Sequence, residues 1–259
     1  MREINAVITI AFRDVTKLLR DRIRIVSSLV FPVIFIGVLG ASLQATLGEQ
    51  IGYNFVVFVF TGVLAQTMFQ STASGVLFLL EDRENDFSQE MFIAPVSPRS
   101  IILGKIMGES LVAFVQGFGI VAFGFIVGVP FTFIQLLLLV PVAFVACLLG
   151  GAFGLLVLAN LSNERTVRQI FPFLIFPQLF LAGVFTPLKD LPIALDILSK
   201  IVPLTYAVDF MRGVYYWGQP EFDQVVVLSP FVNFGIIVLL FTVFLFIGSF
   251  LFMRRERNR

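Results

Sequence analysis

Three polar side chains recur inside a long apolar stretch between residues 54 and 80. Gln66, Gln70 and Ser74 are spaced by four residues, so a helix places them on one face. Polar side chains in such surroundings usually face protein or a cavity. Two interpretations stay open: the face lines a passage or a seam between two copies of the chain, or it forms hydrogen bonds between helices of one copy.

The chain lacks the side chains and motifs of common catalytic sites. It contains no histidine, which removes the commonest general base and the commonest transition-metal ligand. It has no phosphate loop of the form GxxxxGK followed by Ser or Thr, no GxSxG and no HExxH. The acidic cluster after residue 80 (Glu81, Asp82, Glu84 and Asp86) is typical of a solvated helix face. We therefore expect a chain that is not an enzyme and holds no metal or cofactor.

Few charged side chains lie beside the apolar runs. Glu109 follows Lys105 by one helical turn, so the two can form an ion pair at a membrane surface. A proton-coupled carrier would want such a carboxylate, but the structural pair is the favoured interpretation. Asp209 and Arg212 could pair in the same way further along the chain, and their role is open.

Composition places the chain in a membrane. Of 259 residues, 58% are hydrophobic and only 14% are charged, whereas about a quarter of a soluble domain is charged. Apolar runs of near 20 residues match a hydrocarbon core of ~30 Å. The sequence predicts an all-α integral membrane protein in a single domain, 1–259, with six transmembrane helices at about 25–47, 54–80, 106–129, 133–158, 170–185 and 231–253.

The basic residues predict the orientation of the spans. Only three of the 18 lysines and arginines fall in segments on one side, namely Lys189, Lys200 and Arg212. The positive-inside rule then places both termini in the cytoplasm of a multi-pass plasma-membrane protein. The net charge of +1 suggests no nucleic-acid partner. The single cysteine, Cys147, excludes a disulfide within the chain.

Three segments outside the spans are amphipathic. Residues 1–24 are too charged for a signal peptide and predict a helix on the membrane surface or against a partner protein; its apolar positions are Ile4, Val7, Ala11, Val15, Leu18 and Leu19. The cytosolic segment 81–105 predicts a short helix with bulky side chains, which either docks on another protein or packs on its own membrane domain. These side chains are Phe87, Met91 and Phe92.

The third segment, 186–230, lies on the outer side and is unusually apolar. We expect two short helices that dip into the outer leaflet. One would present Ile193, Ile197, Leu198 and Ile201, and the other Val208, Met211 and Tyr215. Just before this segment, Phe173, Phe176 and Phe180 share a face that could contact an apolar substrate, although lipid or packing contacts are the simpler expectation.

The order of these features resembles the ABC-2-type permeases. The most specific part of the resemblance is the stretch AGVFTPLKDLPIALDILSKIVPLTYAVDFMRGVYYWG. The cytosolic loop that ends in LGK, earlier in the chain, is moderately specific. Nearly the whole chain is similar, and the drug-exporter branch, typified by daunorubicin-resistance permeases, and the nodulation-factor exporters are the most alike.

The resemblance implies a mechanism. Two permease subunits, expected as a homodimer in membrane lipid, would bind two ABC ATPase subunits that carry the ATP and Mg. Coupling would pass through the helix that contains Arg83, Phe87, Met91 and Phe92. A hydrophobic or amphiphilic substrate would leave the cell along the dimer interface. The helices at 192–216, with Tyr206, Asp209, Arg212 and Tyr215, would help to form an outer gate.

Other functions stay open from the sequence alone. An ABC-2 permease could instead move a glycan or an ion. A secondary carrier driven by an ion gradient would be expected to show buried charges and inverted repeats, and neither is clear in this sequence. A membrane scaffold or sensor is a third possibility.

Overall fold

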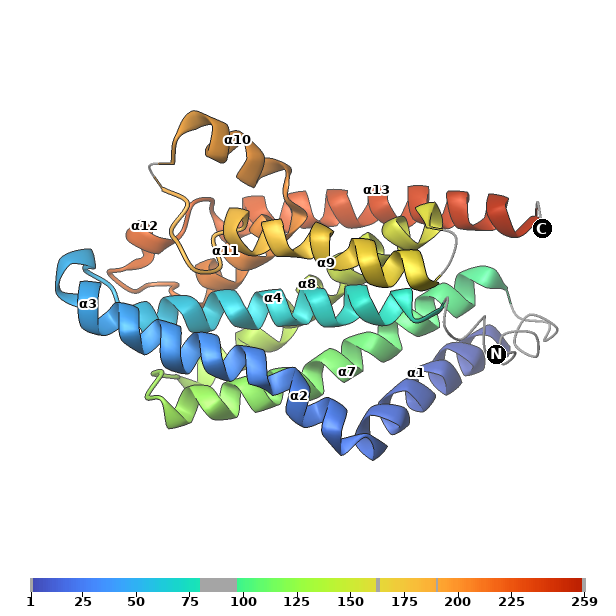
Figure 1. Cartoon of the computed structure of the whole chain (residues 1–259), viewed down its shortest axis with the longest axis horizontal. Helices are drawn as coiled ribbons and strands as arrows, with labels where there is room; N and C mark the ends of the chain where they lie inside the picture. Colours follow the sequence, from blue (N-terminus) through green and yellow to red (C-terminus); the bar gives the residue numbers. More distant parts are fainter. Residues whose placement is uncertain (1, 80–96, 162–163, 190, 258–259) are drawn as a thin grey trace.

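The computed structural model describes residues 2–79, 97–161, 164–189 and 191–257. Every regular element among them is a helix, as expected where no water is present to satisfy backbone groups. The helices run roughly side by side, and both chain termini lie at one end of the bundle (Figure 1). We call this the terminal end, and the other, where α3, α10 and α12 lie, the opposite end.

The first long helix is interrupted in two places. α1 (Arg2–Arg20) ends before Asp21, whose carboxylate accepts a hydrogen bond from the backbone of Arg24 and starts α2 (Arg22–Val33). The predicted surface helix over 1–24 is therefore two helices that meet at an angle (Figure 1). α2 continues through a π-helical turn, η1 (Ile34–Gly40), into α3 (Ala41–Ile51). Gly52 ends it with a positive φ of 75°, which glycine adopts without strain.

α1 packs on α7 (Pro98–Ile126) through a face that differs from the predicted one. Ala11 and Leu18 are buried, but Ile4 and Leu19 are exposed, and the buried face also contains Asp14. The sequence placed all of these apolar positions on one face, since it could not show that α7 would cover only some of them. The apolar side chains of α1 that stay exposed form a stripe suited to contact with a membrane surface, and this stripe consists of Ile4, Ile8, Phe12 and Leu19.

The centre of the bundle is α4 (Phe55–Leu77), which packs against α7, α8 (Phe133–Asn160) and α11 (Pro203–Tyr215). The backbones of α4 and α8 nearly touch. A Cβ atom on Gly150 would lie 2.1 Å from the carbonyl oxygen of Phe69, and one on Gly154 would lie 2.4 Å from that of Ala73. Glycine at these positions therefore allows the close approach.

Five stretches of helix are long and apolar enough to cross a membrane: 22–46, 55–77, 100–126, 133–160 and 222–254. α9 (Glu164–Leu181), where the sequence predicts the fifth of six spans, is not among them. Its first turns carry Glu164, Arg165 and Arg168, which leaves a short apolar run. α9 nevertheless extends alongside α4 from the terminal end (Figure 1). Among the described residues, five helical stretches are therefore candidate spans by length and composition, and the sixth span stays a prediction.

The segment between α9 and the last span folds into three helices: α10 (Ile193–Ile201), α11 and α12 (Phe222–Val225). Two short helices flanking Pro203 match the sequence prediction. Val208, Met211 and Tyr215 of α11 are fully buried in the bundle, whereas the predicted apolar face of α10 is exposed. α13 (Pro230–Arg257) then returns to the terminal end. The start of α7 also differs from the prediction. It begins at Pro98, within the segment 81–105 that was predicted as a cytosolic coupling loop, and Ser97 caps its first turn.

Candidate functional site

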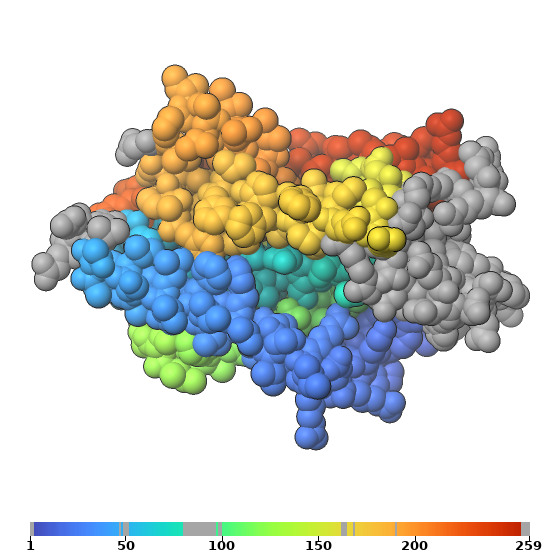
Figure 2. Space-filling model, viewed as in Figure 1, coloured from blue at the N-terminus to red at the C-terminus, as the bar shows by residue number. Residues whose placement is uncertain are grey.

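A groove of about 690 Å³ runs along α4. Its walls are α2, α4 and α9, with Gln116 contributed by α7. In the space-filling view α4 lies, in teal, at the bottom of a hollow between α2 in blue and α9 in yellow (Figure 2). The groove therefore opens sideways at the level of the apolar helices.

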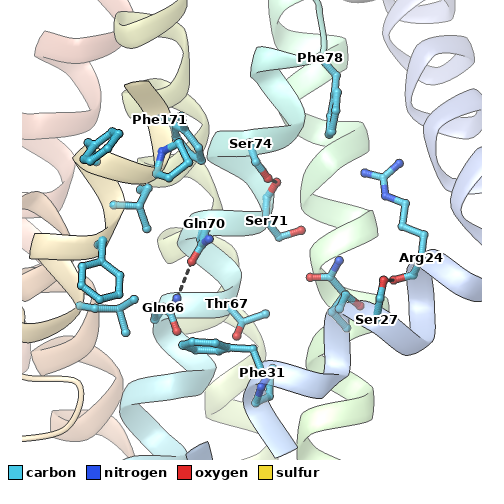
Figure 3. A pocket seen from close by; sticks show the side chains of 18 residues that line it. Arg24, Ser27, Phe31, Gln66, Thr67, Gln70, Ser71, Ser74, Phe78 and Phe171 are labelled. Carbon is cyan, nitrogen blue, oxygen red and sulfur yellow. Dashed lines mark hydrogen bonds between the residues drawn. The ribbon is translucent and has the colours of Figure 1, made fainter. Parts of the chain in front are cut away.

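The α4 wall of the groove is polar. Gln66, Gln70 and Ser74 line it together, with Thr67 and Ser71 beside them (Figure 3). The amide of Gln66 donates a hydrogen bond to the side-chain oxygen of Gln70. Gln66 is only 2% exposed, yet its own side-chain oxygen has no donor among the described residues. The predicted polar face thus lies on a cavity, and one of its acceptors is unsatisfied.

The α9 wall is apolar. Phe173 and Phe176 both line the groove and are 80% and 64% exposed. Phe180, which the sequence grouped with them, does not line the groove; its ring packs edge-on against Phe176 and Phe185. The side of the groove that faces Gln66 and Gln70 is therefore built from exposed aromatic rings.

The α2 wall contains residues that the sequence analysis missed. Arg24, Ser27, Ser28 and Phe31 all face the groove, and their spacing of three and four residues was the signal that could have revealed a shared face. The Arg24 guanidinium lies 5.3 Å from the centre of the Phe78 ring of α4, at the terminal end of the groove. Within the described part of the chain, Arg24 is the only charged residue that lines the groove.

Residues 5–216 match the family model described as ABC-2 type transporter. The chain belongs to the ABC-2 type transporter family. It is 27% identical to the putative transport permease ycf38 of Cyanophora paradoxa over 92% of this chain and 84% of that protein. It is also 24% identical to nodulation protein J of Rhizobium leguminosarum bv. viciae over 76% of each, and similarly to that of Rhizobium meliloti. The chain is thus a membrane permease of an ABC transporter.

Near the opposite end of this ABC-2 permease, Asp209 and Arg212 of α11 are buried but do not form the pair that the sequence suggested. The Asp209 carboxylate accepts three hydrogen bonds of 2.8 Å, from the backbones of Val227 and Leu228 and from the Asn233 amide. Arg212 donates to the carbonyls of Phe58 and Val184, and its guanidinium lies 3.6 Å from the centre of the Phe58 ring. Each charge therefore joins α11 to different neighbours.

The two tyrosines that were predicted with them also bind backbone oxygens. The Tyr215 hydroxyl donates to the carbonyl of Pro130, and that of Tyr206 donates to the carbonyl of Lys200 at 2.6 Å. Tyr206, Asp209, Arg212 and Tyr215 thus each bind different partners, and their role in an outer gate stays a prediction. Their contacts fix α11 between α4, α13 and the 127–132 turn.

A buried charge cluster joins α1 to α7 in the ABC-2 permease. The Lys105 ammonium lies 2.9 Å from Glu109 and 3.0 Å from Asp14, and all three side chains are almost fully buried. The Lys105–Glu109 pair is confirmed. Asp14 was missed because its contact with Lys105 depends on the packing of two helices far apart in sequence. The predicted coupling residues Arg83, Phe87, Met91 and Phe92 lie outside the described residues.

Proposed function

We propose that this permease exports a hydrophobic or amphiphilic substrate, such as a drug-like compound or a lipid, from the cytoplasm or the inner leaflet. The observation that supports this proposal is the groove itself. It offers a polar wall on α4 and an aromatic wall on α9, and it opens toward the surrounding membrane. Such a pair of walls suits a molecule with one polar and one apolar part.

In this proposal two copies of the chain face each other across the groove. The side chains of Phe173 and Phe176 are exposed on this copy, and a second copy would enclose the route that they line. The outer helices α10 and α11 would close its outer end. Both termini would be cytoplasmic in a plasma membrane, in accord with the bias of the basic residues.

Energy would come from ATP and Mg bound to two separate ATPase subunits. Phe87, Met91 and Phe92, with Arg83, are the proposed anchors for them on the cytosolic side. A carrier driven by an ion gradient is less well supported, because the described residues that line the groove include no carboxylate and Glu109 is held by Lys105. An ABC-2 permease for a glycan or an ion would need a route lined mainly by polar groups, and the α9 wall is apolar.

Gln66 offers a test that separates transport from folding. Leucine removes a buried oxygen that has no donor, and the Gln70 oxygen that loses the Gln66 amide is only partly buried, so leucine is a tolerable replacement for stability. The change nevertheless removes a polar group from the groove. We expect Gln66→Leu to lower amphiphile-stimulated ATP hydrolysis by the reconstituted complex about five- to tenfold, since one lost hydrogen bond is worth ~1 kcal/mol. The melting temperature should not fall.

Gln178→Leu is the matched control. Gln178 is also buried and also has a side-chain oxygen without a donor among the described residues, but it does not line the groove. Its replacement should leave stimulation intact. Equal loss of stimulation in both variants, or none in Gln66→Leu, would contradict the groove as the substrate route.

A further inference from the structure

The charges around the groove are one-sided. Among the described residues that line it, Arg24 is the only charged one and none carries a carboxylate. A cation at this end of the groove would meet the like charge of Arg24 and no described counter-ion. An anion would meet a guanidinium with five N–H donors in a planar arrangement that suits carboxylate and phosphate.

We propose that the groove selects amphiphiles with an anionic headgroup, such as a carboxylate or a phosphate, and that Arg24 binds this headgroup. This inference rests on the proposed function, because it names the class of molecule that the same groove would take. Arg24 is half-buried and forms no ion pair among the described residues, although its guanidinium lies over Phe78. A half-buried arginine without an acid is a binding group that lacks its counter-ion.

The surroundings of Arg24 complete a headgroup site. Ser27 on α2 and Ser71 and Ser74 on α4 face one another across this end of the groove (Figure 3). The Ser71 hydroxyl donates no hydrogen bond within the described part of the chain, so it is free to donate to an anion. The Ser27 and Ser74 hydroxyls donate to the backbone carbonyls of Arg24 and Ser71. The Ser71 hydroxyl and the Arg24 guanidinium therefore supply the available donors, one from each of the two helices that wall this end of the groove.

Away from Arg24 the groove is lined by amide side chains on α4 and by aromatic rings on α9. On the α4 wall the hydrogen-bonded side-chain amides of Gln66 and Gln70 form a polar surface for the part of the molecule that follows the headgroup. Phe173 and Phe176 offer an aromatic surface for a chain or ring system. This order, from Arg24 through Gln66 to the phenylalanines, matches an anionic head, a polar linker and an apolar tail.

Binding can be measured with a tryptophan placed inside the groove. Phe78→Trp puts a fluorophore against the Arg24 guanidinium, and Trp217→Phe removes the natural tryptophan of the outer segment. The complete complex with its ATPase would be placed in vesicles of phosphatidylcholine. The probes are a brominated fatty acid and its uncharged methyl ester, both of which quench tryptophan at short range. We expect the acid to bind at least tenfold more tightly than the ester.

Arg24→Gln should remove this preference. Hydrogen bonds to a charged group are the strong ones, so we expect a ten- to hundredfold loss of affinity for the acid and little change for the ester. Arg22→Gln is the matched control, because Arg22 lies on the same helix, is exposed and does not line the groove, while its loss changes the net charge equally.

The outcomes are distinct. Equal quenching by acid and ester, or equal loss in the Arg22 and Arg24 variants, would overturn the headgroup site but leave the groove as an amphiphile route. Quenching by neither probe would overturn the route and, with it, the headgroup site. Brominated phosphatidylglycerol in the bilayer identifies the source: Arg24-dependent quenching by it as well shows an inner-leaflet lipid headgroup, whereas quenching by the fatty acid alone shows a free amphiphile. Either result supports the anionic preference.

Discussion

At the scale of single residues, buried charges in this permease are satisfied mainly by neighbouring helices and backbone groups. Asp209 accepts two backbone N–H groups and one side-chain amide. Arg212 donates to two backbone carbonyls and stacks on a ring. A helical spacing of three therefore suggested a pair that the fold does not make, because stronger partners come from α4 and from the segment before α13.

Arg212→Leu should destabilise the protein markedly. The Val184 carbonyl loses the guanidinium donor, whereas the Phe58 carbonyl keeps a hydrogen bond from the Thr61 hydroxyl. A buried group left unsatisfied costs about 1–3 kcal/mol. We expect the apparent melting temperature of the purified protein in detergent to fall by roughly 5 °C or more. Lys200→Leu is the control, because its ion pair with Asp196 is exposed and worth little. An equal melting temperature for both variants would show that Arg212 does not hold α11 in place.

At the scale of elements, the spans were predictable and their contacts were not. Apolar runs interrupted by charges located five spans to within a few residues, but α7 starts at Pro98 because Ser97 caps it within a polar segment. A helical wheel showed that Gln66, Gln70 and Ser74 share a face. It could not show that Arg24 and Phe173 lie across from them, since that depends on how α2 and α9 pack.

The contact between α4 and α8 gives a test at this scale. Gly150→Ala would bring a Cβ atom to 2.1 Å from the Phe69 carbonyl, so the two helices must separate. Overpacking of this kind typically costs about 1–3 kcal/mol. We expect a lower yield of folded protein and a lower melting temperature. Gly235→Ala in α13 has no atom within 4 Å of the new methyl group and should be neutral or mildly stabilising. A neutral Gly150→Ala would mean that α4 and α8 are further apart.

At the scale of the whole molecule, the shared location of both chain ends agrees with an even number of crossings (Figure 1). An even number would require α9 to cross the membrane in addition to the five candidate spans among the described residues, and this sixth crossing stays a prediction. The sequence predicted six because it counted the apolar part of α9. Proline at 172 and 177 and the charged first turns make α9 dependent on its neighbours for that position.

Single cysteines can determine this topology. Asp223 is exposed beside α12 at the opposite end, and Asn160 is exposed where α8 reaches the terminal end. In intact cells we expect an impermeant maleimide to label Asp223→Cys but not Asn160→Cys, and to label both after lysis. Cys147 is fully buried and should contribute no background. Labelling of Asn160→Cys but not of Asp223→Cys from outside would reverse the predicted orientation. Labelling of both cysteines from outside would place them on the same side of the membrane, so that the crossings between them would have to be recounted.

The central helix also constrains how the chain is made. Of the five candidate spans, α4 has the lowest mean hydropathy and is the most enclosed. In its most apolar stretch 83% of the residues are buried, against 17% in the first and last spans. The ribosome synthesises α4 before α7 and α8. The side-chain amides of Gln66 and Gln70 therefore reach the bilayer before the helices that pack against α4 have been made. We infer that the nascent α4 stays beside the insertion machinery or the first helix until synthesis reaches about residue 160. Chains truncated between α4 and α8 should then be retained by that machinery or degraded.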